Sequence, residues 1–187
     1  MEKRVSVFLA DGFEEIEGLT VVDLLRRAGV VVTTVSITGA QMIHGAHGID
    51  IQADKLFEEM DYSKEDMVVL PGGMPGTLNL GAHAGVKEVL EQFYQAEKYI
   101  SAICAAPSVL GKYGMLEGRR ATSYPGFEGQ LTGAVYCCEP VVTDGFVITS
   151  RGMGTAIDFS LKLIELLVGA PKAEELKKGI IKSDERL

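Results

Sequence analysis

Apolar residues are spaced in two ways along this chain, and the spacing alternates from one segment to the next. Runs of β-branched and apolar residues predict buried strands at residues 3–9, 30–37, 66–70 and 99–103. Apolar residues at helical spacing predict helices at 14–28, 86–93, 105–113 and 155–168. Strand, helix and strand at the start form a βαβ unit, which implies a parallel sheet. The sequence therefore predicts one α/β sandwich, forming a single domain over residues 1–187.

Two segments depart from this alternation and predict β-hairpins. Residues 38–54 are rich in glycine and contain short alternating pieces. The Asp144-Gly145 pair stands between two short apolar runs, which is a hairpin signal. Residues 171–187 are charged and amphipathic, and they close the chain.

The acidic charge balance limits the classes of partner. The chain has 18 basic and 26 acidic residues and a net charge of −8, so we expect neither nucleic acid nor an anionic membrane as a partner. The apolar run after the first four residues is too short for a secretory signal, and no stretch approaches the ~18 apolar residues of a membrane span. We therefore expect a cytoplasmic protein.

Cys104 is the strongest candidate for chemistry. It stands between a predicted strand and a predicted helix, where a sharp turn exposes a side chain on strained backbone. The amino end of the helix favours a thiolate, so we expect a lowered thiol pKa. The alternative is a buried, inert cysteine, which is common for this residue type.

Glycines at the end of the neighbouring strand could complete a site around this cysteine. Gly72 and Gly73 follow Pro71, and glycine lets the backbone approach a ligand closely. The N–H groups of Gly73 and Ala105 could together form an oxyanion hole beside Cys104. A plain turn is the alternative for these glycines.

Three acids open the first predicted helix: Glu14, Glu15 and Glu17. Acids in a first turn usually complement the helix dipole. One of the three could instead point into the crevice, where burial would raise its pKa and let it exchange a proton with the sulfur.

Other chemistry-bearing residues have weaker signals. His44 and His47 lie in the Gly-rich segment without a third ligand in view, so we expect no metal. Three cysteines without a C-x-x-C spacing disfavour a disulfide framework, and Cys137 and Cys138 are expected in a strand as small core or interface residues.

Two further segments could border a pocket at Cys104. The first contains Tyr124, which follows a predicted strand. The alternative interpretation of Tyr124 is a half-buried residue of a turn. The second contains Arg151, at the entry of the last long helix, where an anion site or a flexible helix start are the two interpretations.

Four segments in this order resemble the ThiJ/PfpI superfamily, in particular the branch of the Parkinsonism-associated protein deglycase and its bacterial relatives. The segments are Ala10-Asp11-Gly12-Phe13-Glu14-Glu15-Ile16-Glu17, Leu70-Pro71-Gly72-Gly73, Ala102-Ile103-Cys104-Ala105-Ala106-Pro107 and Thr149-Ser150-Arg151-Gly152-Met153-Gly154-Thr155. The resemblance runs from residue 3 to residue 170.

The resemblance implies a flavodoxin-like three-layer sandwich, a homodimer and no cofactor. It assigns Cys104 as the nucleophile, Glu17 as the acid bonded to its sulfur, and Gly73 and Ala105 as backbone donors. Gly72, Tyr124 and Arg151 are expected to line the pocket. The implied activities are conversion of small reactive aldehydes (glyoxalase), repair of glycated substrates (deglycase), peroxide sensing and chaperone action.

Three departures from the family pattern narrow these activities. Tyr124 stands where some members have a histidine, so proton transfer falls on Glu17 or water. Met153 stands where the family usually has a proline. Ala105 stands where the protease-like branch has a histidine, and this second difference argues against a peptidase. No histidine follows residue 83, which argues against a glutaminase.

We therefore predict a cysteine-dependent enzyme acting on small aldehydes. The alternative is a redox-sensing stress protein or chaperone in which Cys104 is oxidised without turnover.

Overall fold

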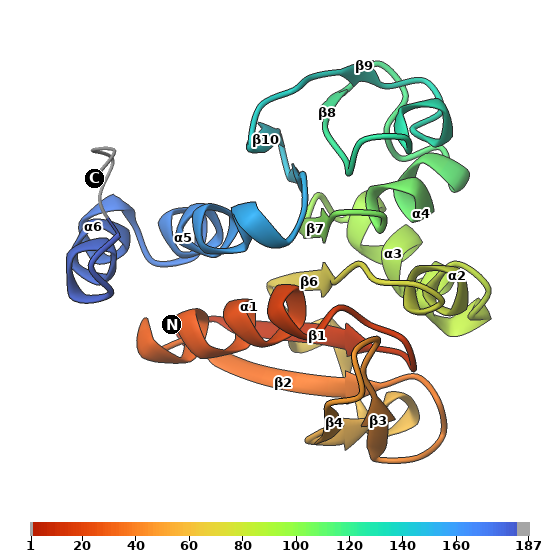
Figure 1. Ribbon diagram of the computed structural model, residues 1–187, viewed down its shortest axis with the longest axis horizontal. Coiled ribbons are helices and arrows are strands. Elements are labelled where there is room, and N and C mark those ends of the chain that lie inside the picture. The colour runs from red at the N-terminus through yellow and green to blue at the C-terminus, as the bar shows by residue number, and fades with distance from the viewer. Residues whose placement is uncertain (1, 183–187) are drawn as a thin grey trace.

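The computed structural model describes residues 2–182, and its centre is a seven-stranded sheet with the order β10-β11-β7-β6-β1-β2-β5. The strands are β1 (Arg4–Leu9), β2 (Val31–Ser36), β5 (Lys55–Leu56), β6 (Met67–Leu70), β7 (Tyr99–Ile103), β10 (Val141–Asp144) and β11 (Val147–Ser150). Only the pairing of β10 with β11 is antiparallel within this sheet. The carboxyl ends of β1, β6, β7 and β11 therefore meet at one edge (Figure 1).

Helices cover both faces of the sheet, which makes three layers (Figure 1). One face packs against α1 (Glu15–Arg27), α5 (Ala156–Leu167) and α6 (Ala170–Gly179). The other packs against α2 (Gly76–Leu80), α3 (Ala84–Gln95) and α4 (Pro107–Lys112). Alternate residues of β1 take part in both cores: Val7 lies on the α1 side and Phe8 on the α3 side. This is the flavodoxin-like α/β sandwich that the sequence predicts.

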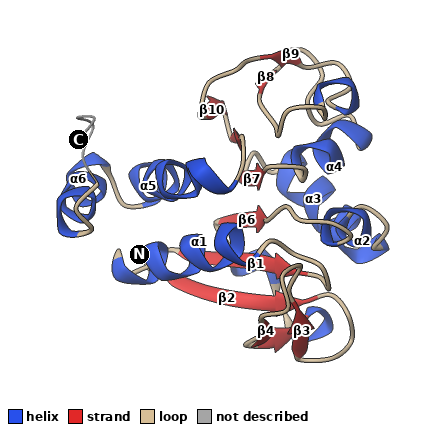
Figure 2. Ribbon diagram, viewed as in Figure 1, coloured by secondary structure: helices blue, strands red, loops and turns tan. Residues whose placement is uncertain are grey.

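Small elements outside the main sheet border the same edge. The hairpin predicted at residues 38–54 is confirmed as β3 (Met42–His44) and β4 (Asp50–Gln52). The hairpin predicted around Asp144-Gly145 is also confirmed, as β10 and β11 of the main sheet. The pair β8 (Arg120–Ala121) and β9 (Val135–Tyr136) stands apart from the main sheet on the side of α4 (Figure 2). Single 3-10 turns occupy Phe57–Glu59, Tyr62–Lys64, Glu128–Gln130 and Met153–Thr155.

The prediction that Cys137 and Cys138 lie in a strand is wrong, and their interface alternative stays a prediction. Strand β9 ends at Tyr136, so neither cysteine is in a strand. Cys137 is half-buried and Cys138 is exposed, because the chain leaves the β8–β9 pair and crosses the surface toward β10. Neither side chain belongs to the core.

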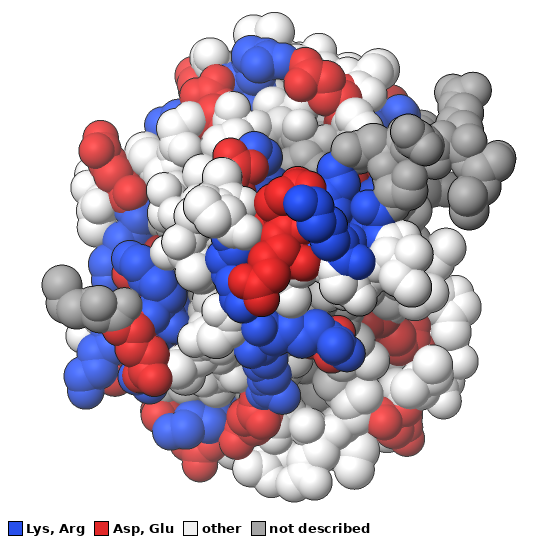
Figure 3. All heavy atoms as spheres, turned by 90° about the vertical axis from the view of Figure 1, so that its left-hand side faces the viewer, with Lys and Arg blue, Asp and Glu red and all other residues white. Residues whose placement is uncertain are grey.

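The amino ends of the strands face the opposite side of the molecule. Basic and acidic side chains are mixed over this face, without a large area of one sign (Figure 3). Among residues 2–182, no helix combines the length and apolar character needed to cross a bilayer. Residues 183–187 of the predicted charged end lie outside the described residues.

Candidate active site

Cys104 occupies the sharp corner between β7 and α4. Its φ of 66° is in the left-handed region, which is rarely adopted outside glycine. Two hydrogen bonds hold this conformation: its N–H donates to the Ser150 carbonyl at 2.9 Å, and its carbonyl accepts from the Tyr124 N–H at 2.8 Å. The side chain is half-buried. The predicted strained corner is therefore confirmed, and three chain segments position it.

Backbone donors surround the Cys104 sulfur. The N–H groups of Gly73 and Ala105 both act on it as hydrogen-bond donors. Gly73 has a φ of 89°, and a methyl group there would lie 2.3 Å from the Glu14 nitrogen, so only glycine fits. This arrangement presents two N–H groups to negative charge that develops on the sulfur or on an atom bonded to it.

Glu17 is the acid that points into this corner. It lies in the first turn of α1 and is 1% exposed. Its Oε2 accepts a hydrogen bond from the Gly72 N–H at 2.9 Å, and the Met153 N–H and the Cys104 side chain are further partners of the carboxyl group. Among the described residues Glu17 has no ion pair.

Glu17 and Cys104 perturb each other. Burial is the main cause that raises the pKa of Glu17 to about 7. Burial, followed by the charge and hydrogen bond of Glu17, raises the pKa of Cys104 to about 12, although the Gly73 and Ala105 amides lower it. The expectation of a lowered thiol pKa is therefore wrong beside a charged Glu17, because the short helix α4 does not offset burial next to a carboxylate.

The two groups titrate as one coupled unit. The pair loses its first proton near pH 7, the pKa of Glu17, and above that pH holds one proton between carboxylate and sulfur. When the proton resides on Glu17, the charge that opposes a thiolate is gone and the two amide donors remain. The geometry thus permits a thiolate through proton transfer to Glu17.

Glycines bring these groups into close contact. A methyl group at Gly72 would lie 2.6 Å from Glu17 Oε2 and 2.7 Å from Cys104 Cβ. A methyl group at Gly152 would lie 3.3 Å from the Tyr124 ring and 3.9 Å from Cys104 Sγ. The Tyr124 ring and Gly152 therefore lie close to the sulfur, and Tyr124 is 51% exposed.

The backbone of Gly152 and Met153 takes part in the site, which the residue types alone do not predict. Met153 donates its N–H to Glu17, and Gly152 leaves space beside the sulfur. The signal was present, because both residues follow β11, the parallel neighbour of β7. Their contribution is made by the main chain, which residue types do not reveal.

Glu15 also lies buried, but it points away from Cys104 toward the β3–β4 hairpin. It accepts hydrogen bonds from the His47 N–H at 2.7 Å and pairs with His47 Nδ1 at 3.0 Å. Ligand atoms of Glu14, Glu15 and His47 lie within 4.8 Å of one another and could hold a metal ion. His44 instead pairs with Asp50 at 2.8 Å. The ion pairs account for both histidines: the His44 pair lies within the hairpin, and the His47 pair fastens the hairpin to α1.

A sequence profile described as the DJ-1/PfpI family matches residues 3–166. This chain belongs to the DJ-1/PfpI family. It is 39% identical over 183 residues to protein dj-1beta of Drosophila melanogaster, covering 97% of this chain and 98% of that protein. The crystal structure of Drosophila DJ-1beta gives a TM-score of 0.93, with 98% of this chain and 100% of that chain covered.

Two other DJ-1 proteins are similar over nearly the whole chain. The glutathione-independent glyoxalase DJ-1 of Schizosaccharomyces pombe is 30% identical over 187 residues, covering 95% of this chain and 97% of that protein. The structure of oxidized Toxoplasma gondii DJ-1 is 33% identical, with a TM-score of 0.92, and the match covers 96% of this chain and 98% of that one. The DJ-1/PfpI homologues of this chain thus include a named glyoxalase.

Proposed function

We propose that this DJ-1/PfpI protein converts small 2-oxoaldehydes to 2-hydroxy acids without a thiol cofactor. The observation that carries the proposal is the direct contact between the Cys104 sulfur and the buried Glu17 carboxyl group, with the Gly73 and Ala105 amides on the same sulfur. The similarity to the glutathione-independent glyoxalase of Schizosaccharomyces pombe supports this choice of substrate class.

The reaction needs one water and no oxidant or reductant. The Cys104 thiolate forms a carbon–sulfur bond with the aldehyde carbon, and the amides of Gly73 and Ala105 stabilise the resulting oxyanion. The aldehyde hydrogen leaves as a proton and returns to the neighbouring carbon, which oxidises the first carbon and reduces the second. The product is a thioester of a 2-hydroxy acid, and water cleaves the carbon–sulfur bond to release the acid.

Glu17 is the proton carrier in each step. It accepts the thiol proton when the nucleophile forms, and it is the nearest acid to move the proton between the two carbons. A pKa of about 7 suits both tasks, because the carboxyl group then gives and takes protons with little cost at neutral pH. Tyr124, at the position where some relatives have histidine, leaves this role to Glu17.

The test is turnover of methylglyoxal to lactate by the purified full chain and by Cys104→Ala. We expect lactate from the wild type and loss of at least about 10³-fold in kcat for the variant, because the covalent route is removed. Cys138→Ala is the matched control and keeps full activity, since that thiol is exposed and outside the site. Equal lactate formation by wild type and Cys104→Ala would overturn the proposal.

The remaining expectations stay predictions. Repair of glycated substrates requires the same sulfur, and redox sensing requires its oxidation. Mass spectrometry after mild peroxide treatment would detect this oxidation as two oxygens gained at Cys104 before Cys137 or Cys138.

A homodimer would cover the exposed apolar side chains Ile16, Ile49 and Ile157, which line one groove beside α1. The molar mass in solution tests the dimer.

A further inference from the structure

Arg151 differs from the other arginines of the described chain. Arg4, Arg26, Arg27, Arg119 and Arg120 each lie within ion-pair distance of a carboxylate. Within residues 2–182, the Arg151 guanidinium has neither a hydrogen bond nor an ion pair, and its Nε is buried without a partner. In a chain with eight more acidic than basic residues, a half-buried arginine without a carboxylate is unusual.

The position of Arg151 relates it to the reactive sulfur. Its neighbour Ser150 accepts the Cys104 N–H through the backbone carbonyl, and a methyl group on its other neighbour, Gly152, would lie 3.9 Å from Cys104 Sγ. The Arg151 backbone is therefore fixed at the rim of the candidate active site. The main chain there is also anchored by the Arg151 N–H, which donates to the Pro140 carbonyl at 3.3 Å.

Glu128, the acidic side chain that interacts with Arg151, is exposed and lies beyond ion-pair distance of it. Tyr136 and Glu128 are close enough to interact with it electrostatically. The Glu128 carboxylate accepts the Gly126 N–H at 2.8 Å and interacts with the Tyr136 hydroxyl, which is buried and makes no short hydrogen bond. A guanidinium and a hydroxyl without a short hydrogen bond thus lie near each other at the segment that follows β11, and both are donors for an anion.

We propose that Arg151 and Tyr136 form a subsite for an anionic group on the substrate, so that 2-oxoaldehydes with a carboxylate on their chain are preferred over neutral ones. The inference rests on the proposed function. A guanidinium recognises a carboxylate through two parallel hydrogen bonds, and a phenol hydroxyl adds a third. The subsite would bind the substrate while Cys104 and Glu17 act at its aldehyde end, so Arg151 sets specificity and takes no part in bond making.

The test compares two substrates with five carbons each, 4,5-dioxopentanoate and the neutral 2-oxopentanal. Both follow the same balanced reaction, to 2-hydroxyglutarate and 2-hydroxypentanoate. For the wild type we expect kcat/KM to favour the anion by about tenfold or more, the effect of a charged hydrogen bond. Arg151→Gln should remove this preference through KM, and Arg151→Lys should restore part of it. Arg27→Gln, which loses an exposed charge paired with Asp23, is the matched control and keeps the preference.

The outcomes separate this inference from the proposed function. If Arg151→Gln lowers kcat/KM for both substrates equally, Arg151 is structural and the subsite is wrong. The same conclusion follows if the wild type does not prefer the anion. If the wild type turns over neither substrate, the proposed function fails, and the subsite is then judged by binding. Calorimetry should show 2-hydroxyglutarate binding at least about tenfold more tightly than 2-hydroxypentanoate, a difference lost in Arg151→Gln; equal affinities would overturn the subsite.

Discussion

Two buried glutamates lie at opposite ends of the sheet, and their surroundings differ in one respect. Glu17 is 1% exposed at the carboxyl ends of the strands, and Glu65 is 4% exposed at the amino ends, just before β6. Burial is the main cause that raises the pKa of each. The two side chains therefore begin from the same physical situation, a carboxyl group removed from water.

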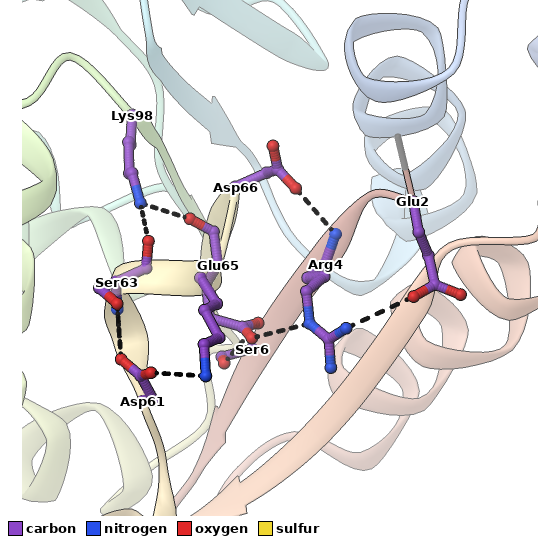
Figure 4. A network of polar contacts seen from close by, with 9 residues as sticks. Glu2, Arg4, Ser6, Asp61, Ser63, Glu65, Asp66 and Lys98 are labelled. Carbon is purple, nitrogen blue, oxygen red and sulfur yellow. Dashed lines mark hydrogen bonds and ion pairs between the residues drawn. The ribbon is translucent and has the colours of Figure 1, made fainter.

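The Glu65 carboxylate faces cations and a hydroxyl group. Its Oε2 accepts a hydrogen bond from Ser6 Oγ at 2.9 Å, and Arg4 Nε lies 3.7 Å from Oε1 (Figure 4). Lys98 adds positive charge nearby and donates to the Glu65 carbonyl at 2.8 Å. Within the part of the chain that the structure describes, Glu17 has backbone donors but no ion pair, and it contacts the thiol of Cys104.

This difference shows what makes a buried carboxylate reactive. A nearby cation stabilises the charge of Glu65 and reduces its tendency to take up a proton, so the group serves the structure. Glu17 lacks that stabilisation and touches another acid, so a proton can pass between the two groups. Exchange near neutral pH follows from the missing cation and from burial together.

The largest expected effect separates the two glutamates by activity. Glu17→Gln keeps the shape of the side chain but cannot take a proton, and we expect kcat for methylglyoxal to fall by about 10²–10⁴-fold. Alkylation of Cys104 should lose any step near pH 7, where Glu17 titrates in the wild type, and the pKa of the thiol should fall below about 12, because the charge of Glu17 that raises it is gone. Glu65→Gln is the control and should change kcat by less than about twofold. Similar losses of kcat in both variants would show that the two carboxylates act only through folding, and would contradict a proton-carrying role of Glu17.

The next effect is on stability as a function of pH. Glu17 has an ordinary pKa of 4.5 in the unfolded chain and about 7 in the folded one. Its protonated form is therefore favoured by folding: the stabilisation is complete below pH 4.5 and is lost as the pH rises through 7, by about 3 kcal/mol in total. Glu17→Gln does not titrate, so its free energy of unfolding should gain about this amount over the wild type between pH 4.5 and 8.

Urea unfolding at several pH values measures this gain. Glu65→Gln provides the comparison and should gain less with pH, because the Ser6 hydrogen bond and the Arg4 charge lower the Glu65 pKa against the effect of burial. A difference between Glu17→Gln and wild type that stays constant with pH would contradict an uncompensated Glu17 charge.

The smallest expected effect tests the close approach at Gly72. In Gly72→Ala the new methyl group meets both Glu17 and Cys104 and must push them apart. Overpacking of this kind costs about 1–3 kcal/mol, so we expect alkylation of Cys104 at pH 7 to change by about tenfold and turnover to fall. Gly129→Ala, whose added methyl group meets nothing within 4 Å, is the control and should leave both rates unchanged. If Cys104 in Gly72→Ala is alkylated at the wild-type rate, close contact between Glu17 and Cys104 is not needed for the reactivity of the thiol.

Local patterning predicted much of this molecule. The strand at residues 99–103, the helices α3 and α4 on either side of it and the two hairpins follow from periodicity and turn residues, which act over a few positions. Cys104 was identifiable because a strand-to-helix junction is a local feature, and Gly73 because a backbone turn with positive φ requires glycine. The surface position of Cys137 and Cys138 was missed because the apolar run around them resembles a strand that pairs only at Val135–Tyr136.

The selection among Glu14, Glu15 and Glu17 was left to the tertiary structure. All three residues open the same helix, and periodicity does not say which of them meets Cys104 from another strand and which meets His47 from a hairpin. The pKa direction of Cys104 was decided in the same way, since it depends on burial and on a carboxylate 87 positions earlier in the sequence. The sequence by itself determined the elements and the reactive residue types, because those follow from local sterics and polarity. Only the packed sheet, which brings four strand ends together away from water, decided their protonation.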